Sequence, residues 1–214
     1  MILTYPMGPF NANCYLIINE TSKEAAAVDP SDAEKVDSFL KEKDLKLTHI
    51  LLTHRHFDHL AGVAELKQRT QCRVLIHPLD QAGLTDPEVC RAAWLGGVLT
   101  PCEPTDLVLD GDVVHAAGSK FRVLLTPGHT AGGVCYVCDE EQYAFTGDTV
   151  FFEGVGRTDL PTGNMRELMH SLCDIVLQLP ESYTLYPGHG EATTVAHEST
   201  YNPMLRYRRN PWFS

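Results

Sequence analysis

The most informative segment of the chain is Thr53-His54-Arg55-His56-Phe57-Asp58-His59. It follows the apolar run 50–52 and places three imidazoles and one carboxylate within six positions. On an extended chain, His54 and His56 point the same way and can hold one ion. If a helix begins at Asp58, then Asp58 and His59 face a second position beside the first. Zinc, iron and manganese accept imidazole and carboxylate ligands, so the segment predicts a metal site.

A histidine-rich polar loop that arose by chance is the plain alternative. Histidine makes up 10 of the 214 residues, so three within six positions around an acid are a steep excess. A motif match still needs the right structural context, and the rest of the chain supplies it.

Length and charge restrict the classes of protein. The chain is long enough for a large core and shows no repeat, linker or low-complexity tract, so we expect a single domain, residues 1–214. Its formal charge of −11 disfavours a nucleic-acid partner. A small anionic substrate is compatible with that charge, because bound metal cations and nearby arginines dominate the field at a site.

The sequence lacks the signals of export and membrane insertion. No apolar run is long enough to span a membrane, and residues 1–6 lack the basic start and apolar core of a signal peptide. Seven cysteines at irregular spacings fit reduced thiols, so we expect a cytoplasmic protein without a membrane partner. Cys135 and Cys138 form a CxxC pair within a predicted strand, where they should face opposite sides and do no redox chemistry.

The first part of the chain alternates strands with helices. Strands are predicted at 14–18, 25–28, 48–52 and 73–76, and helices after Ser31 and at about 60–69. Ser31 and Glu34 have the spacing of a capping box. Residues 79–105 interrupt the alternation, with a short helix predicted from Pro87 to Ala93. This excursion is either a lid or substrate wall, or a surface insertion.

The second part is richer in β-structure. It contains predicted strands at 121–125, 134–137, 143–146 and 183–186. A helix capped by Asn164 has an apolar stripe that continues to Leu179, and a last helix is predicted at 194–202.

Metal-capable side chains recur where the later strands end. A glycine precedes each of them and lets the backbone turn: His129 after strand 121–125, Asp148 after strand 143–146, and His189 after strand 183–186. Any one of these alone is as well explained by an ordinary turn or loop residue. Together with the first segment, four strand ends offer ligands to one edge of a sheet structure, which predicts a shared site. The remaining histidines lack this setting and are expected to be structural or on the surface: His49, His77, His115, His170 and His197.

This set of residues resembles the metal motif of the metallo-β-lactamase superfamily, over about residues 13–203. The resemblance implies an α/β (α+β) fold: an αββα sandwich of two mixed β-sheets flanked by helices, with the metal site at one edge. It implies two divalent metal ions, zinc first and iron or manganese as alternatives. The implied ligands are His54, His56 and His129 for the first ion, Asp58, His59 and His189 for the second, and Asp148 between them. Asp29 resembles an early aspartate that supports such a site from behind its ligands.

Within the superfamily the chain resembles short-form, glyoxalase II-type hydroxyacylglutathione hydrolases. The similarity lies in residues 28–30, 146–151, 156–161 and 187–190. It implies hydrolysis of a thioester such as S-lactoylglutathione by a hydroxide that bridges the metals, with Asp58 as a catalytic residue and Arg157 as a substrate contact. A thiol pKa of about 8.5 makes thiolate a good leaving group for such a site. For Arg157 the alternative is a structural turn in which its guanidinium pairs with a carboxylate.

The resemblance departs from the longer glyoxalase II enzymes in two places. Those enzymes bind glutathione with a C-terminal helical domain and a tyrosine-bearing loop, whereas this chain has Gly154-Val155-Gly156-Arg157 in that loop and ends at Ser214. Arg206, Arg208 and Arg209 are therefore either contacts for an anionic substrate or a solvated basic tail.

Related functions compete with the thioester hydrolase. A persulfide dioxygenase keeps much of the motif but would hold one iron through His54, His129 and Asp148. A β-lactamase is less consistent, because several secreted lactamases have cysteine in place of Asp148 and no export signal is found. An RNA-processing nuclease is disfavoured by the acidic charge. A scaffold that had lost its metals should show gaps among the seven ligand positions, and all seven are filled.

Overall fold

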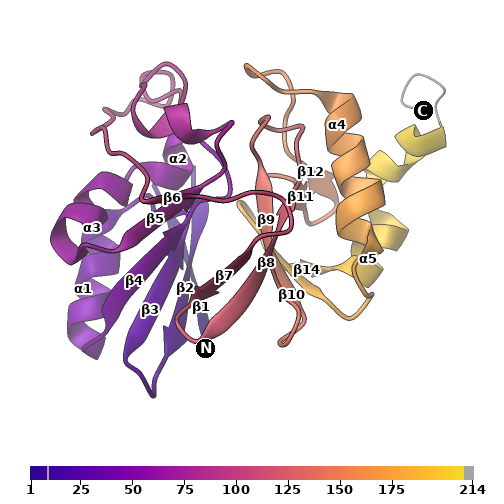
Figure 1. Ribbon diagram of the computed structural model, residues 1–214. Coiled ribbons are helices and arrows are strands. Elements are labelled where there is room, and N and C mark those ends of the chain that lie inside the picture. The colour runs from indigo at the N-terminus through magenta and orange to yellow at the C-terminus, as the bar shows by residue number, and fades with distance from the viewer. Residues whose placement is uncertain (9, 210–214) are drawn as a thin grey trace.

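Two mixed β-sheets lie face to face, and helices cover the outer face of each (Figure 1). The computed structural model describes residues 1–8 and 10–209. The strand order is β1-β2-β3-β4-β5-β6 in the first sheet and β14-β13-β10-β9-β8-β7 in the second. This arrangement confirms the αββα sandwich that the sequence implied. No helix in the described ranges is both long and apolar enough to cross a membrane.

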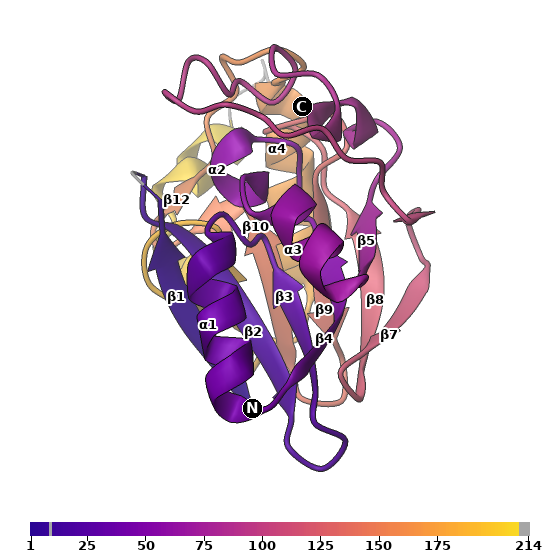
Figure 2. The ribbon, with the colours of Figure 1, turned by 90° about the vertical axis from the view of Figure 1, so that its left-hand side faces the viewer.

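The first sheet comes from the N-terminal half of the chain. Its strands are β1 (Ile2–Met7), β2 (Ala12–Asn19), β3 (Glu24–Val28), β4 (Lys46–Leu51), β5 (Arg73–Ile76) and β6 (Asp106–Leu107). The pairs β1–β2 and β2–β3 are antiparallel, whereas β3 to β6 run parallel. Helices α1 (Ala33–Lys43), α2 (Phe57–Leu60) and α3 (Val63–Thr70) cover its outer face, which faces the viewer in Figure 2.

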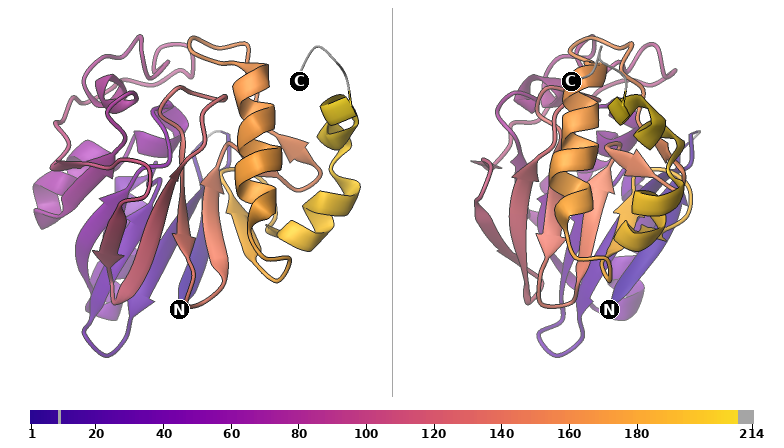
Figure 3. Two further views of the ribbon diagram at one scale, coloured as in Figure 1. Left: turned by 45° about the vertical axis from the view of Figure 1, so that its right-hand side comes forward. Right: turned by 90° about the vertical axis from the view of Figure 1, so that its right-hand side faces the viewer.

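The second sheet comes from the C-terminal half. Its strands are β7 (Val113–Ala116), β8 (Ser119–Leu125), β9 (Val134–Cys138), β10 (Tyr143–Gly147), β13 (Thr184–Pro187) and β14 (Thr193–Thr194). A separate two-stranded hairpin joins β11 (Val150–Phe151) to β12 (Gly154–Val155). Helix α4 (Met165–His170) continues as a π turn over Ser171–Ile175, and α5 (Val195–Tyr201) lies beside it outside the sheet (Figure 3).

Three layers of apolar side chains hold the sandwich together. Along β2, Cys14, Leu16 and Ile18 pack toward the outer helices, and the alternate residues Tyr15 and Ile17 pack between the sheets. Both faces of the strand are buried, which is why its sequence is continuously apolar. The same alternation along β9 sends Cys135 toward α4 and Cys138 between the sheets. The prediction that these two thiols face opposite sides is therefore confirmed.

Several element boundaries differ from the sequence predictions. Asp32, not Ser31, caps α1, because its side chain accepts a hydrogen bond from the Lys35 N–H at 3.1 Å. The helix expected at 60–69 is divided into α2 and α3 around Gly62, where an added Cβ would lie 2.8 Å from the Pro30 carbonyl oxygen. Helix α2 begins at Phe57, so Asp58 and His59 do lie in a helix.

The short helix predicted at residues 87–93 is wrong. That segment consists of turns, and a 3-10 helix lies earlier, at Gln81–Leu84. Asp86 accepts hydrogen bonds from the Glu88 and Cys90 N–H groups, as at the start of a helical turn, but Arg91 then adopts a left-handed backbone with φ 65°. Such a residue ends a right-handed helix. Strand β1 and the two-residue strands were missed, since they are irregular or too short to show a period of two.

Candidate metal centre

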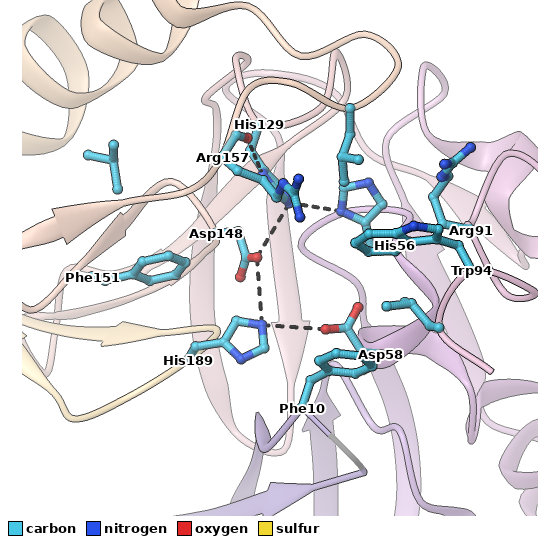
Figure 4. Close-up of a pocket in the computed structure, with 13 residues that line it drawn as sticks. Phe10, His56, Asp58, Arg91, Trp94, His129, Asp148, Phe151, Arg157 and His189 are labelled. Carbon is cyan, nitrogen blue, oxygen red and sulfur yellow. Dashed lines mark hydrogen bonds and ion pairs between the residues drawn. The ribbon is translucent and has the colours of Figure 1, made fainter. Parts of the chain in front are cut away.

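All seven predicted ligands lie together at one edge of the sandwich. Strands β3 and β4 run parallel in one sheet, and β8, β10 and β13 share a direction in the other, so the loops after these strands meet. Figure 4 shows five of the side chains pointing toward one another: His56, Asp58, His129, Asp148 and His189. The sequence pattern of metal-capable side chains after strand ends therefore identified residues that lie close together in the structure.

The first group of ligand atoms belongs to His54, His56 and His129. Their ring nitrogens lie within 4.8 Å of one another, and all three residues are buried. The His56 Nδ1 and His129 Nε2 atoms are only 2.8 Å apart, and the buried His54 Nε2 has no hydrogen-bond partner. Three ring nitrogens that converge in this way, one of them without a partner among the described residues, are a geometry that a cation satisfies.

Hydrogen bonds behind the rings select which nitrogens keep a lone pair. His129 Nδ1 lies 2.7 Å from the Arg157 carbonyl oxygen, so it donates and leaves Nε2 as the acceptor. His54 Nδ1 lies 3.0 Å from Thr53 Oγ1, which itself donates to Asp29 Oδ2 at 2.5 Å. Thr53 Oγ1 must then accept from His54, so the free Nε2 points into the group.

The second group consists of Asp58, His59 and His189. Their ligand atoms also lie within 4.8 Å of one another. His59 Nε2 is 3.2 Å from His189 Nε2 and 3.8 Å from Asp58 Oδ2, and His189 Nε2 is 3.5 Å from the same carboxylate oxygen. Two imidazoles and one carboxylate are therefore presented to one point.

Asp148 stands between the two groups. Its Oδ1 lies 3.5 Å from His59 Nε2, and its Oδ2 lies 3.4 Å from His129 Nε2 and 3.7 Å from His189 Nε2. The buried Oδ1 has no hydrogen-bond partner. Gly188 packs closely against this oxygen, because a Cβ added at Gly188 would lie 2.1 Å from it. One carboxylate therefore faces both groups, as a bridging ligand must.

The electrostatics of the site fit divalent cations. Burial and the facing imidazoles lower the pKa of His54, and they lower the pKa of His56 to about 2, so both rings stay neutral. Burial opposes a charge on His59, but Asp148, Asp58 and Asp29 outweigh it and raise its pKa to about 10. A proton held there by three carboxylates marks a place where positive charge is stabilised, and metal binding displaces that proton.

Asp29 lies behind the imidazoles. It is 1% exposed, and its carboxylate accepts hydrogen bonds from the Thr53 N–H at 2.8 Å and from His59 Nδ1 at 3.0 Å. Although Asp29, His54 and His59 also form a possible ligand group, these bonds occupy the Asp29 oxygens. The contacts agree with the supporting role that the resemblance implied for Asp29, by which it would orient His59.

Sequence reasoning missed Asp80, which ties the ligand loops together. Asp80 is fully buried and accepts hydrogen bonds from the Arg55 N–H at 3.1 Å, Thr130 Oγ1 at 2.6 Å and the Gly132 N–H at 3.0 Å. Arg55 in turn donates to the Pro161 carbonyl oxygen at 2.6 Å. Asp80 lies four residues after the end of β5 and is not preceded by glycine, so the pattern of strand, glycine and ligand did not indicate it.

A cavity of about 420 Å³ opens over the ligands. It has apolar walls, and the excursion at residues 79–105 contributes one of them through Arg91, Trp94 and Leu95, which favours a substrate wall over a surface insertion (Figure 4). Arg157 also lines the cavity, but its guanidinium forms a bidentate pair with Asp159 at 2.6 and 2.7 Å. A direct substrate contact by Arg157 stays a prediction.

The remaining sequence predictions fall outside this site. The five histidines set aside above belong to none of the possible ligand groups among the described residues. Arg206 is exposed, as a solvated basic tail requires, whereas the side chains of Arg208 and Arg209 lie outside the described part of the structure.

Relatives of known name share most of the chain. A Haemophilus influenzae protein named hydroxyacylglutathione hydrolase GloC is 33% identical over 203 residues, which cover 94% of this chain and 95% of that protein. The structure of BLEG-1, a B3 metallo-β-lactamase, has a TM-score of 0.90 and 36% identity and covers 96% of this chain and 99% of its own. The di-iron-bound form of TTHA1623 has a TM-score of 0.82 and 34% identity, with coverage of 94% and 99%.

Residues 7–189 match the family model described as the metallo-β-lactamase superfamily. This range includes every ligand discussed above. The similar structures have the same fold over nearly their whole length. The chain belongs to the metallo-β-lactamase superfamily.

Proposed function

We propose that this protein is a metal-dependent hydrolase of thioesters, of the kind that cleaves S-lactoylglutathione. The observation that carries the proposal is the pair of ligand groups joined by Asp148 in a chain that is similar to GloC over 94% of its length. Superfamily membership supports a metal-dependent hydrolase, and the similarity to a hydroxyacylglutathione hydrolase supports the thioester.

The residues take distinct parts in this proposal. His54, His56 and His129 would hold one divalent ion, Asp58, His59 and His189 a second, and Asp148 would contact both. When bound, such ions supply an activated water and Lewis acidity toward the substrate carbonyl. Zinc fits these ligands, and the di-iron form of the similar TTHA1623 supports iron as an alternative.

The lining of the cavity favours a thioester. Besides the ligands, its polar side chains are Arg91 and Arg157, and it has no lysine, tyrosine or cysteine among the described residues. An arginine cannot give up its proton near neutral pH. A leaving amine would need a proton, whereas a thiolate with a conjugate-acid pKa of about 8.5 departs without one. The apolar walls would bind the carbon chain of a small carrier thiol.

One experiment tests two rival activities, β-lactam hydrolysis and persulfide oxidation. The similarity to BLEG-1 makes a β-lactam the first rival, and a persulfide dioxygenase with one iron is the second. The zinc-loaded and iron-loaded proteins should each be assayed with S-lactoylglutathione, with a cephalosporin, and for oxygen uptake with glutathione persulfide. We expect thioester hydrolysis to have the highest kcat/KM. Faster opening of the β-lactam, or oxygen uptake without hydrolysis, would refute the proposal.

The division of ligands between the two ions predicts the behaviour of Asp58→Ala. Asp58 Oδ2 faces His59 and His189 but belongs to no group with His54. We expect metal content to fall from two ions per chain to one and kcat to fall at least about a hundredfold, since Asp58 is also the expected catalytic carboxylate. Elemental analysis alongside circular dichroism checks this. Loss of both ions from a folded variant would contradict the division.

A further inference from the structure

Arg91 is held beside the metal ligands by the backbone of the excursion. The Phe57 N–H donates to the Cys90 carbonyl oxygen at 2.9 Å, one residue before Arg91 and one residue before the ligand Asp58. Further along, Gly97 packs so closely that a Cβ there would lie 2.0 Å from the Phe57 ring. These two contacts fix the excursion to the start of α2, so the position of Arg91 relative to the cavity is set by the fold.

The guanidinium of Arg91 has no counter-ion. Within residues 1–8 and 10–209 it takes part in no ion pair or hydrogen bond, and its Nε is buried without a partner. Arg157 on the opposite side of Trp94 differs, because Asp159 neutralises it with two hydrogen bonds. An arginine that lines a cavity without a counter-ion can pair with an anionic group of a ligand that enters the cavity.

The surroundings of Arg91 keep its charge available to a ligand. Its guanidinium carbon lies 6.0 Å from the centroid of the Trp94 ring, and the Arg157 guanidinium carbon lies 5.4 Å from the same centroid. Figure 4 shows Arg91 and Trp94 together at the rim, away from His189. Arg91 also has a left-handed backbone with φ 65°, a conformation that non-glycine residues rarely adopt.

We infer that Arg91 binds a carboxylate at the far end of the substrate's carrier thiol. The inference rests on the proposed thioester hydrolysis, because it assigns the ligands to the acyl end of the substrate and the rim to the carrier end. Arginine matches a carboxylate with two parallel hydrogen bonds. Carriers that end in a carboxylate are then preferred to neutral thiols, although the whole chain has a charge of −11.

A matched pair of substrates tests this inference. The metal-loaded enzyme is assayed with S-lactoylglutathione and with its dimethyl ester, which differ only in whether the carrier's carboxylates are free. For Arg91→Met we expect KM for the free acid to rise roughly ten- to hundredfold, as for the loss of a charged hydrogen bond, with kcat within about twofold. KM for the ester should stay unchanged, and Arg91→Lys should restore part of the difference.

Controls separate this result from general damage. Arg122→Met removes an arginine on β8 that pairs with Asp139, just after β9 and outside the cavity lining, and should leave the kinetics with both substrates unchanged. Metal content of Arg91→Met should equal that of the wild type. An equal change for acid and ester, or no change for either, would overturn the inference and leave the proposed hydrolysis standing.

A binding measurement keeps the inference testable if the protein hydrolyses neither substrate. In that case the proposed function fails, and calorimetry with S-methylglutathione and its dimethyl ester takes the place of kinetics. Wild-type protein should bind the free acid roughly tenfold or more tightly than the ester, and Arg91→Met should bind both alike. Equal binding of acid and ester by the wild-type protein would refute the assignment of Arg91.

Discussion

Asp148→Ala is expected to lose metal and activity together. Its carboxylate lies 3.4 to 3.7 Å from imidazole nitrogens of both ligand groups, so it is placed to contact an ion in each. Without the Asp148 carboxylate, His129, His59 and His189 would lose the negative charge between them. That charge would offset the positive charge of two bound divalent ions. Lewis acidity and an activated water contribute several kcal/mol to such reactions, so kcat/KM should fall about a thousandfold or more.

This variant is measured by elemental analysis and thioester hydrolysis on the same preparation. Asp139→Ala is the matched control, since that carboxylate lies beyond β9 and pairs with Arg122 on the surface. The control should keep two ions and normal turnover. If Asp148→Ala kept both ions and turned over normally, the bridging position would be assigned to the wrong residue.

Among the substitutions proposed here, Asp80→Ala is expected to lower the free energy of unfolding the most. The fully buried carboxylate accepts three hydrogen bonds and lies 4.0 Å from Arg55 Nε. Its removal leaves the buried Arg55 cation uncompensated and two main-chain N–H groups without acceptors. Removing one partner of a buried ion pair costs about 3–5 kcal/mol, so the free energy of unfolding should fall by about that amount.

Guanidinium unfolding of metal-saturated protein measures this loss. The control is Asp106→Ala, which removes an exposed carboxylate that also makes a bidentate pair, with Arg73. Exposed pairs contribute roughly 0–1 kcal/mol, so the control should change little. If the free energy of unfolding fell by the same small amount in both variants, Asp80 would not be the residue that holds the ligand loops together.

The ligands could be predicted because their placement follows from local sequence. His129, Asp148 and His189 each come after an apolar strand and a glycine, and parallel neighbours bring such strand ends to one edge. Gly128 and Gly147 have φ values of 133° and 49°, so glycine makes both turns easy. A pattern contained in a few consecutive residues was therefore sufficient to name side chains that gather at this edge, whereas the fold was inferred from the resemblance to the superfamily.

What could not be predicted depends on contacts between distant segments. The Arg157 carbonyl group determines which nitrogen of His129 keeps its lone pair, and Thr53 does the same for His54. Arg157 is distant from His129 in the sequence, so its contact could not be predicted from the residues around His129. The same holds for the role proposed for Arg91, which rests on the absence of a counter-ion among the described residues. The helix expected at 87–93 is interrupted at Arg91, whose left-handed backbone with φ 65° is not revealed by the apolar pattern of the sequence.

The central claim is that two metal ions share one carboxylate in this chain. X-ray diffraction from the metal-loaded crystal, measured on both sides of the zinc and iron absorption edges, tests it most directly. Two anomalous peaks are expected on either side of Asp148, one contacted by His54, His56 and His129 and the other by Asp58, His59 and His189. A single peak that touches only His54, His129 and Asp148 would contradict the two-metal account and point to the mononuclear alternative.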